Sequence, residues 1–275
     1  MNIEKSAAAF GRQYSVLAPY YEKLNSEADY DKYADFIERE IKLYGKENTE
    51  IVLELACGTG AITRRLSERG FDMIGIDISE NMLSEAYRLE HVFNSETGYK
   101  AEQRRHKSSK ILYLCQDMCE LELYGTAKAM VSVCDSINYL LEEDEIIWTL
   151  QSVNRYLEPG GIFIFDFNTV YKYETVLGDT TICENREEGS FIWENYYDKE
   201  EQINEYDLTL FIREEEQLYR KFEETHYQRG YSLEQMHTLV EEAGMEFLAA
   251  YDAETKKSPT ADSERIYIIA GEKGK

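Results

Sequence analysis

Residues 52–60 read VLELACGTG, an apolar run that ends in a turn containing two glycines, and the sequence GIDIS follows at 75–79. An apolar run bounded by a glycine turn predicts a buried strand. The second apolar run ends on Asp77. In open α/β sheets, ligands bind at the carboxyl ends of the strands, so the question is what this turn holds.

Strand and helix patterns alternate on either side of this turn. We expect a helix within 29–45, then strands at 51–55, 73–77, 111–115, 129–134 and 161–167, with helices at about 61–69, 80–90 and 144–157 between them. Alternation of this kind indicates βαβ units and a mainly parallel sheet that is covered on both faces. The predicted fold class is therefore α/β.

The pattern changes from residue 189 onward, where apolar residues alternate in FIWENYYDK, INEYDLTLFIRE and QLYRKFEETHYQRG. This alternation, broken by short charged turns, predicts a three-stranded antiparallel meander, which would form a lid inserted into the α/β domain. Ser232 and Gln235 then give a capping-box signal for a helix that ends before Gly244. Two last strands, 246–251 and 265–270, are joined by a polar linker, which favours an antiparallel final strand.

The net charge of −24 restricts the partners of this chain. A strongly negative surface repels phosphate backbones, so nucleic-acid substrates are disfavoured. Five cysteines are scattered through apolar runs, which indicates reduced thiols and a cytoplasmic protein. No segment has the pattern of a membrane span or a secretion signal. A basic cluster within 100–110 is either an exposed loop or a docking site; it contains Arg104, Arg105, His106, Lys107 and Lys110.

The glycine turn matches neither of two common phosphate-binding motifs. Gly58 and Gly60 match the first two glycines of a dinucleotide fingerprint, but Thr63 stands at the third position. No lysine follows Gly60 as a phosphate loop requires. Glu54, on the strand just before the turn, would repel a pyrophosphate and attract a cation. These residues disfavour a nicotinamide-dependent oxidoreductase.

At this turn the sequence resembles the class I S-adenosylmethionine-dependent methyltransferases, whose first motif reads acidic-x-G-x-G-x-G. Glu54, Gly58 and Gly60 match that motif, and Ala56 replaces one glycine. The resemblance implies that S-adenosylmethionine is the cofactor. It also implies that Glu54 and the backbone carbonyls around Ala56 and Cys134 hold the ammonium group of the cofactor.

Later segments carry the same resemblance in the same order. Asp77 corresponds to the acid that accepts the ribose hydroxyls, and Asp117 and Met118 resemble the adenine contacts. VSVCDSINYLL at 131–141 and LEPGGIFIFDFN at 157–168 resemble the motifs of the fourth and fifth strands. The resemblance thus implies a cofactor site made of Tyr14, Tyr21, Glu54, Ala56, Gly58, Gly60, Asp77, Ile78, Met82, Asp117, Met118, Cys134 and Asp135.

The resemblance covers nearly the whole chain and implies its architecture. That architecture is a Rossmann-like seven-stranded sheet, mostly parallel with the last strand antiparallel, plus the three-stranded lid. We expect an N-terminal entry segment at 1–45, the core at 46–172 and 231–275, and the lid at 173–230. The lid is similar to that of the bacterial small-molecule branch, which includes glycine and amino-sugar N-methyltransferases. The expected partner is a small molecule such as an amine, with no nucleic acid and no membrane.

Methyl transfer from a sulfonium needs an aligned nucleophile and, for an amine, a proton acceptor, but no metal. We expect a methyltransferase acting on nitrogen or oxygen, with a non-catalytic S-adenosylmethionine-binding protein as the alternative. The candidate proton acceptors are Asp135, Asp166 and His226, although a histidine on a lid strand is more often exposed. The candidate substrate contacts are Asn138, Tyr139, Asn168 and Trp193. The spacing of the cysteines and histidines predicts no metal site.

Overall fold

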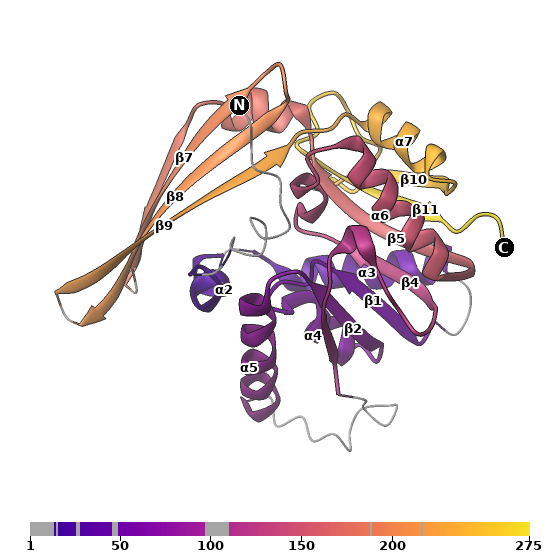
Figure 1. Cartoon of the computed structure of the whole chain (residues 1–275), viewed down its shortest axis with the longest axis horizontal. Coiled ribbons are helices and arrows are strands. Elements are labelled where there is room, and N and C mark those ends of the chain that lie inside the picture. The colour runs from indigo at the N-terminus through magenta and orange to yellow at the C-terminus, as the bar shows by residue number, and fades with distance from the viewer. Residues whose placement is uncertain are drawn as a thin grey trace.

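The computed structural model describes residues 14, 16–25, 28–45, 49–96, 110–187, 189–215 and 217–275. These residues form an α/β core from which a long antiparallel sheet projects (Figure 1). The basic residues Arg104, Arg105, His106 and Lys107 lie outside the described residues, as do residues 1–13 of the expected entry segment.

The core is a seven-stranded sheet in the order β10-β11-β5-β4-β1-β2-β3. Its strands are β1 (Ile51–Leu55), β2 (Asp72–Asp77), β3 (Leu112–Cys115), β4 (Ala127–Ser132), β5 (Leu157–Asn168), β10 (Glu246–Asp252) and β11 (Arg265–Gly271). The first five pair in parallel, whereas β11 is antiparallel to both β5 and β10, so the predicted fold class is confirmed. The chain order reverses between β1 and β4, which is where open α/β sheets bind ligands.

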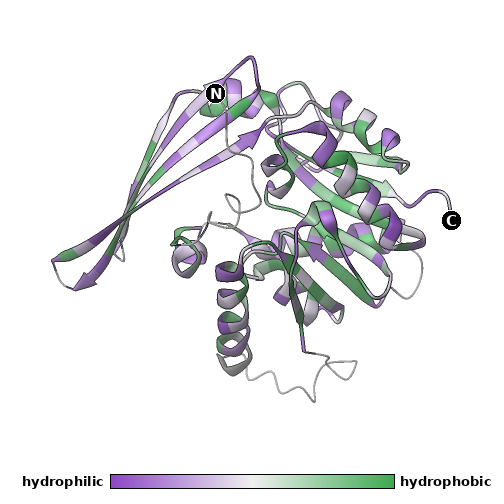
Figure 2. Cartoon of the chain, in the orientation of Figure 1, coloured by the Kyte–Doolittle hydropathy of each residue, from purple (hydrophilic) through white to green (hydrophobic). Residues whose placement is uncertain are grey.

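Helices cover both faces of this sheet. They are α3 (Tyr30–Tyr44), α4 (Ala61–Glu68) and α5 (Glu80–Glu96) on one face, and α6 (Glu143–Tyr156) and α7 (Leu233–Glu242) on the other. Each face has its own apolar cluster: Val52 and Leu66 belong to one, Leu150 and Phe165 to the other, and each is at most 1% exposed. Figure 2 shows the apolar strands enclosed between the helices, as expected for a parallel sheet that is buried on both faces.

The helix ends follow their sequence signals. Ser232 Oγ accepts the Gln235 N–H at 3.1 Å and the Gln235 side chain accepts the Ser232 N–H at 2.9 Å, so the capping box of α7 is confirmed. Helix α5 runs on to Glu96, because no glycine or proline stops it after the expected end near residue 90. No helix in the described part of the chain is long and apolar enough to cross a membrane.

The projecting sheet, called the lid below, has four antiparallel strands. They are β6 (Thr181–Asn185), β7 (Gly189–Asp198), β8 (Ile203–Glu215) and β9 (Leu218–Arg229), paired in chain order. The predicted meander accounts for the last three, and the three-stranded prediction missed β6. This edge strand reads TICEN and is largely exposed, so it shows no apolar alternation, and Glu and Asn are depleted in strands.

The entry segment lies between the core and the lid, where it forms η1 (Ala18–Tyr20) and α2 (Tyr21–Leu24) (Figure 1). Leu17 packs with Leu210 and Ile212 of β8. The Glu224 carboxylate on β9 accepts the Tyr14 N–H at 3.0 Å and the Val16 N–H at 2.7 Å. One carboxylate therefore attaches the entry segment to the lid.

Candidate active site

Two strained turns follow β1 and β4 at the point where the strand order reverses. After β1, Ala56, Gly58 and Gly60 have φ angles of 51°, 53° and 75°. After β4, Cys134 and Asp135 have φ angles of 64° and 56°. Residues with a side chain rarely adopt this left-handed backbone, and such strain concentrates at binding and catalytic sites. The two turns therefore indicate a ligand pocket at this edge of the sheet.

Replacing Ala56 by glycine is expected to raise the free energy of unfolding by up to about 1 kcal/mol, because glycine adopts a positive φ without steric cost. Chemical denaturation followed by circular dichroism measures the change. The matched control is Ala86→Gly in the middle of α5, which should lower stability instead. A loss of stability in Ala56→Gly would contradict the interpretation of Ala56 as strained.

Glu54 is a buried carboxylate on β1 that lines a pocket and is 3% exposed. Its Oε2 accepts a hydrogen bond from the Thr63 hydroxyl, and among the described residues no cation forms an ion pair with it. Burial raises the pKa of Glu54 to about 8, because the Thr63 hydrogen bond and the attraction of Arg64 offset only part of the lost hydration. A cationic ligand group would supply the missing stabilisation of the carboxylate.

Asp77 ends β2 and faces the same turn. Its Oδ2 accepts the Gly58 N–H at 2.7 Å, and its Oδ1 accepts the Ser79 N–H at 2.8 Å. Burial outweighs these hydrogen bonds and raises the pKa of the carboxyl group. Each carboxylate oxygen has more than one acceptor site, so Asp77 retains capacity for further donors.

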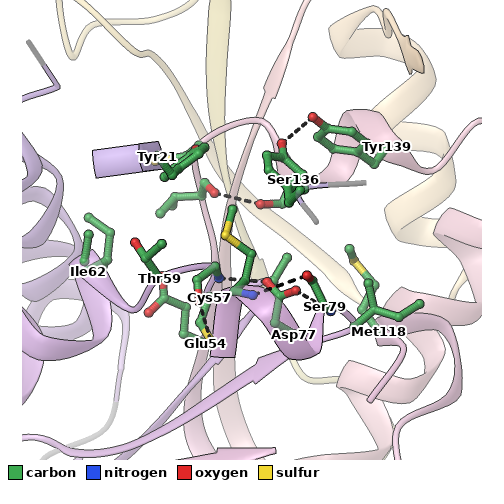
Figure 3. Close-up of a pocket in the computed structure, with 18 of the residues that line it drawn as sticks. Tyr21, Glu54, Cys57, Thr59, Ile62, Asp77, Ser79, Met118, Ser136 and Tyr139 are labelled. Atoms are coloured by element: carbon green, nitrogen blue, oxygen red, sulfur yellow. Dashed lines mark hydrogen bonds between the residues drawn. The ribbon is translucent and has the colours of Figure 1, made fainter. Parts of the chain in front are cut away.

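These groups line one pocket at the carboxyl ends of β1, β2 and β4, called the first pocket below (Figure 3). Glu54 and Asp77 lie on one side of it, and Tyr21 and Tyr139 lie on the opposite side. The first pocket brings together most of the expected cofactor contacts, namely Tyr14, Tyr21, Glu54, Ala56, Gly58, Asp77, Ile78, Met82, Asp117, Met118 and Cys134.

A second pocket lies between the lid and the core, and it shares Tyr14, Tyr21 and Tyr139 with the first pocket. Three strands of the lid, β7, β8 and β9, each contribute two residues that are two positions apart, as expected when one face of a strand lines a pocket. They are Phe191 and Trp193, Tyr206 and Leu208, and His226 and Gln228. Of the expected substrate contacts, Tyr139, Asn168 and Trp193 line this pocket. Asp135, expected at the cofactor, lines the second pocket and not the first.

Arg265, the first residue of β11, organises the polar side of the second pocket and was not predicted from the sequence. Its Nη2 donates to Asp135 Oδ1 at 2.5 Å, its Nη1 to Asp166 Oδ2 at 3.3 Å and its Nε to Asn168 Oδ1 at 3.1 Å. Asp166 is fully buried, lines neither pocket, and accepts the backbone N–H groups of Cys134 and Asp135 at 3.1 and 2.7 Å. Asp166 therefore stabilises the strained turn that follows β4.

His226 on β9 is only 4% exposed, so the expectation of an exposed lid histidine was wrong. It is buried because its strand face is covered by the entry segment, whose Tyr14 ring lies 4.8 Å from the imidazole ring. His226 Nδ1 lies 3.3 Å from Tyr139 Oη, and Nε2 lies 3.3 Å from Glu224 Oε2. Tyr139 Oη also hydrogen-bonds Tyr14 Oη. A carboxylate, an imidazole and two phenols thus form a chain that begins at the tyrosines shared by the two pockets.

Two other expected site residues line neither pocket. Gly60 is the N-cap residue just before α4, and a Cβ at this position would lie 2.6 Å from Tyr113 Oη, so the glycine is required by packing. Asn138 is fully buried and donates to the Asn168 and Arg229 carbonyls at 2.9 and 2.7 Å, which joins η3 (Ser136–Tyr139) to β5 and β9. Both residues support the pockets rather than face them.

This sheet order, with an acidic glycine turn at its switch point, fits the S-adenosylmethionine-dependent methyltransferases that the sequence resembles. Among the residues that the structure describes, no three His, Cys, Asp or Glu side chains are grouped so that they could hold a metal ion. A family model for a methyltransferase domain matches residues 52–161.

The chain is 33% identical over 257 residues to a putative methyltransferase of Geobacillus sp. strain WCH70, an alignment that covers 94% of this chain and 98% of that protein. It therefore belongs to the S-adenosylmethionine-dependent methyltransferase family.

Two further proteins resemble the chain to different extents. A crystal structure of an S-adenosylmethionine-dependent methyltransferase from Clostridium acetobutylicum ATCC 824 matches with a TM-score of 0.79 and 28% identity, covering 93% of this chain and 96% of that one. The dTDP-3-amino-3,4,6-trideoxy-alpha-D-glucopyranose N,N-dimethyltransferase of Streptomyces venezuelae is 27% identical over 115 residues, or 42% of this chain and 41% of that protein.

Proposed function

We propose that this methyltransferase transfers the methyl group to a nitrogen or oxygen of a small molecule that binds in the second pocket. The observation that carries the proposal is that the two pockets share Tyr14, Tyr21 and Tyr139. A cofactor in the first pocket and an acceptor in the second would meet at these tyrosines. The net charge of −24 disfavours a nucleic acid as the acceptor.

The residues of the first pocket fit S-adenosylmethionine. Glu54, a buried carboxylate with no ion-pair partner among the described residues, would hold the ammonium group. Asp77 would accept the ribose hydroxyls, and the apolar side chains of Met82 and Met118 would pack against the adenine. The bound cofactor supplies an electrophilic methyl group on a sulfonium.

His226 is the proton acceptor that we favour among the three candidates. Asp166 lines neither pocket, and both Asp135 oxygens already accept hydrogen bonds, from Arg265 at 2.5 Å and from Gln228 at 2.8 Å. His226 instead lies beside Tyr139, which faces both pockets.

In this proposal, Tyr139 Oη contacts the acceptor atom and positions it for in-line attack. As the bond from the acceptor atom to the methyl carbon forms and the bond from that carbon to sulfur breaks, the acceptor loses a proton. Tyr139 passes this proton on to His226. Glu224 Oε2 lies 3.3 Å from His226 Nε2 and stabilises the resulting imidazolium.

The acceptor class and the compartment also belong to this proposal. The Streptomyces relative is named as an amino-sugar N,N-dimethyltransferase, which supports an amine as the acceptor. All five cysteines are free, which supports a reducing compartment, and we propose the cytoplasm.

Formation of S-adenosylhomocysteine from S-adenosylmethionine tests the proposed function. The purified protein is incubated with the dialysable, RNA and protein fractions of a bacterial extract, and the product is quantified by mass spectrometry. We expect product only with the dialysable fraction. Product with RNA or protein alone would place the acceptor in another class, and none with any fraction would favour a non-catalytic binding protein.

The affinity for S-adenosylmethionine is expected to rise with pH up to about 8. In the free protein, burial raises the pKa of Glu54 to about 8, so below that pH the carboxyl group is mostly protonated. A bound ammonium favours the carboxylate, so binding at pH 7 releases a proton, and the affinity rises about tenfold per pH unit below 8. Above about 8 the cofactor ammonium itself loses its proton, and the rise stops.

Titration calorimetry at several pH values measures this dependence, and the matched control is Glu54→Gln. The glutamine keeps an acceptor for the Thr63 hydroxyl but cannot ionise. We expect weaker binding that is flat between pH 6 and about 8 in this variant. A pH dependence equal to that of the wild type would exclude Glu54 as the titrating group.

A further inference from the structure

Lys172 places a positive charge in the second pocket, at the start of η4 (Lys172–Leu177), where the chain leaves the core for the lid. Its ammonium donates to Asn168 Oδ1 at 3.0 Å, and among the described residues it forms no ion pair. An ammonium has three donors, so two of them are available to a ligand.

The other charges of the second pocket are already paired. Asp135 accepts from Arg265 and Gln228, and the Arg265 guanidinium lies between Asp135 and Asp166. Burial and the charge of Arg265 lower the pKa of Lys172, although the carboxylates of Asp135 and Asp166 partly oppose this. The surroundings of Lys172 therefore stabilise its charged form incompletely, and an anion beside the ammonium would supply the missing stabilisation.

Trp193 on β7 lines the same pocket and carries a second donor that has no partner among the described residues. Its Nε1 is buried and has no hydrogen-bond partner within the described part of the chain. An indole N–H can only donate, and a buried donor without a partner is rare in folded proteins. Lys172 and Trp193 line the second pocket but not the first, so both are set apart from the cofactor side, where the three shared tyrosines lie.

Resting on the proposed function, we propose that the methyl acceptor carries an anionic group, a carboxylate or a phosphate, which binds Lys172 and the Trp193 indole N–H. The nucleophile of the same molecule then faces Tyr139 at the other side of the pocket. Because the chain carries a net charge of −24, its surface repels anions, and a cation inside the pocket provides the local attraction that such an acceptor needs.

Nitrogen-15 NMR of the indole N–H groups tests this proposal on the S-adenosylhomocysteine-bound protein. The chain has two tryptophans; Trp193 lines the pocket, and Trp148, which is 52% exposed on α6, is an internal reference. Acetate and inorganic phosphate are titrated separately at constant ionic strength, with chloride as the balancing anion. We expect a saturable shift of the Trp193 signal with at least one of these anions and none for Trp148.

Three lysine variants complete the test. Lys172→Met should lower the affinity for the anion at least about tenfold. Lys172→Arg should keep that affinity within a few-fold of the wild type. Lys199→Met, which removes an exposed lysine of the lid that pairs with Glu174, is the charge-matched control and should bind as the wild type does. Saturation by acetate alone would indicate a carboxylate acceptor, and saturation by phosphate alone would indicate a phosphorylated one.

Two results would overturn the inference: no Trp193 shift with either anion, or equal anion affinity in Lys172→Met and wild type. A different result would contradict the proposed function, namely that no S-adenosylhomocysteine forms with the dialysable extract. A protein that shows this turnover but no anion site would retain the proposed function and lose the anionic acceptor.

Discussion

Replacing Asp77 by alanine is expected to weaken the binding of S-adenosylmethionine about a hundredfold. The carboxylate accepts the Gly58 and Ser79 N–H groups at 2.7 and 2.8 Å, so it fixes the turn, and we propose it as the acceptor of the ribose hydroxyls. A hydrogen bond to a charged group contributes about 1.5–3 kcal/mol, so losing two of them to the ribose costs roughly 3 kcal/mol or more. Titration calorimetry of the variant and the wild type measures the change.

Cofactor analogues that lack the 2′- or 3′-hydroxyl distinguish ribose binding from damage to the turn. If Asp77 accepts these hydroxyls, the wild type binds the analogues more weakly than the cofactor, whereas Asp77→Ala binds all of them alike. Asp117→Ala removes another acidic residue of the first pocket and should keep the discrimination. Equal discrimination by Asp77→Ala and wild type would contradict the ribose assignment.

Replacing His226 by alanine is expected to lower kcat about a hundredfold, because a positioned general base contributes about 10²–10⁴ to the rate. His226 Nδ1 lies 3.3 Å from Tyr139 Oη, and its Nε2 lies 3.3 Å from Glu224 Oε2, so the imidazole is oriented from both sides. It lines only the second pocket, so the affinity for S-adenosylmethionine should stay the same. Single-turnover kinetics with the dialysable acceptor and calorimetry with the cofactor measure the two quantities.

The Tyr139→Phe variant and the double variant decide whether the two side chains act as one unit. If the proton passes from Tyr139 to His226, each single change costs a similar factor in kcat and the double change costs no more than either. His237→Ala is the matched control, since His237 also pairs with a glutamate but is 47% exposed on α7. Additive losses, or a loss of cofactor binding in His226→Ala, would exclude the proposed relay.

The core could be predicted from the sequence because its signals are local. The run 52–60 places a strand, a turn and the start of a helix in order, and the structure finds β1 at Ile51–Leu55 and α4 from Ala61. Glu54 and Asp77 lie on adjacent parallel strands whose carboxyl ends reach the same edge, so their shared pocket follows from the strand pattern.

The second pocket could not be predicted in the same way, because it depends on contacts between residues far apart in the chain. Arg265 pairs with Asp135 across 130 positions, and no local pattern indicates which carboxylate an arginine will meet. His226 could have been placed by strand parity, because it faces Tyr206 across the β8–β9 pair on the pocket side of the lid. Its burial, however, depends on the entry segment that Glu224 holds against the lid.

Titration calorimetry with S-adenosylmethionine, S-adenosylhomocysteine and NAD, at pH 7 in two buffers of different ionisation enthalpy, tests most directly that the turn after β1 is a site for a cationic cofactor. The two sulfur compounds are predicted to bind at one site, with release of close to one proton from Glu54, whose pKa is about 8 in the free protein. NAD is predicted not to bind. Binding of NAD alone, or binding of S-adenosylmethionine without proton release, would contradict the account of Glu54 and the turn.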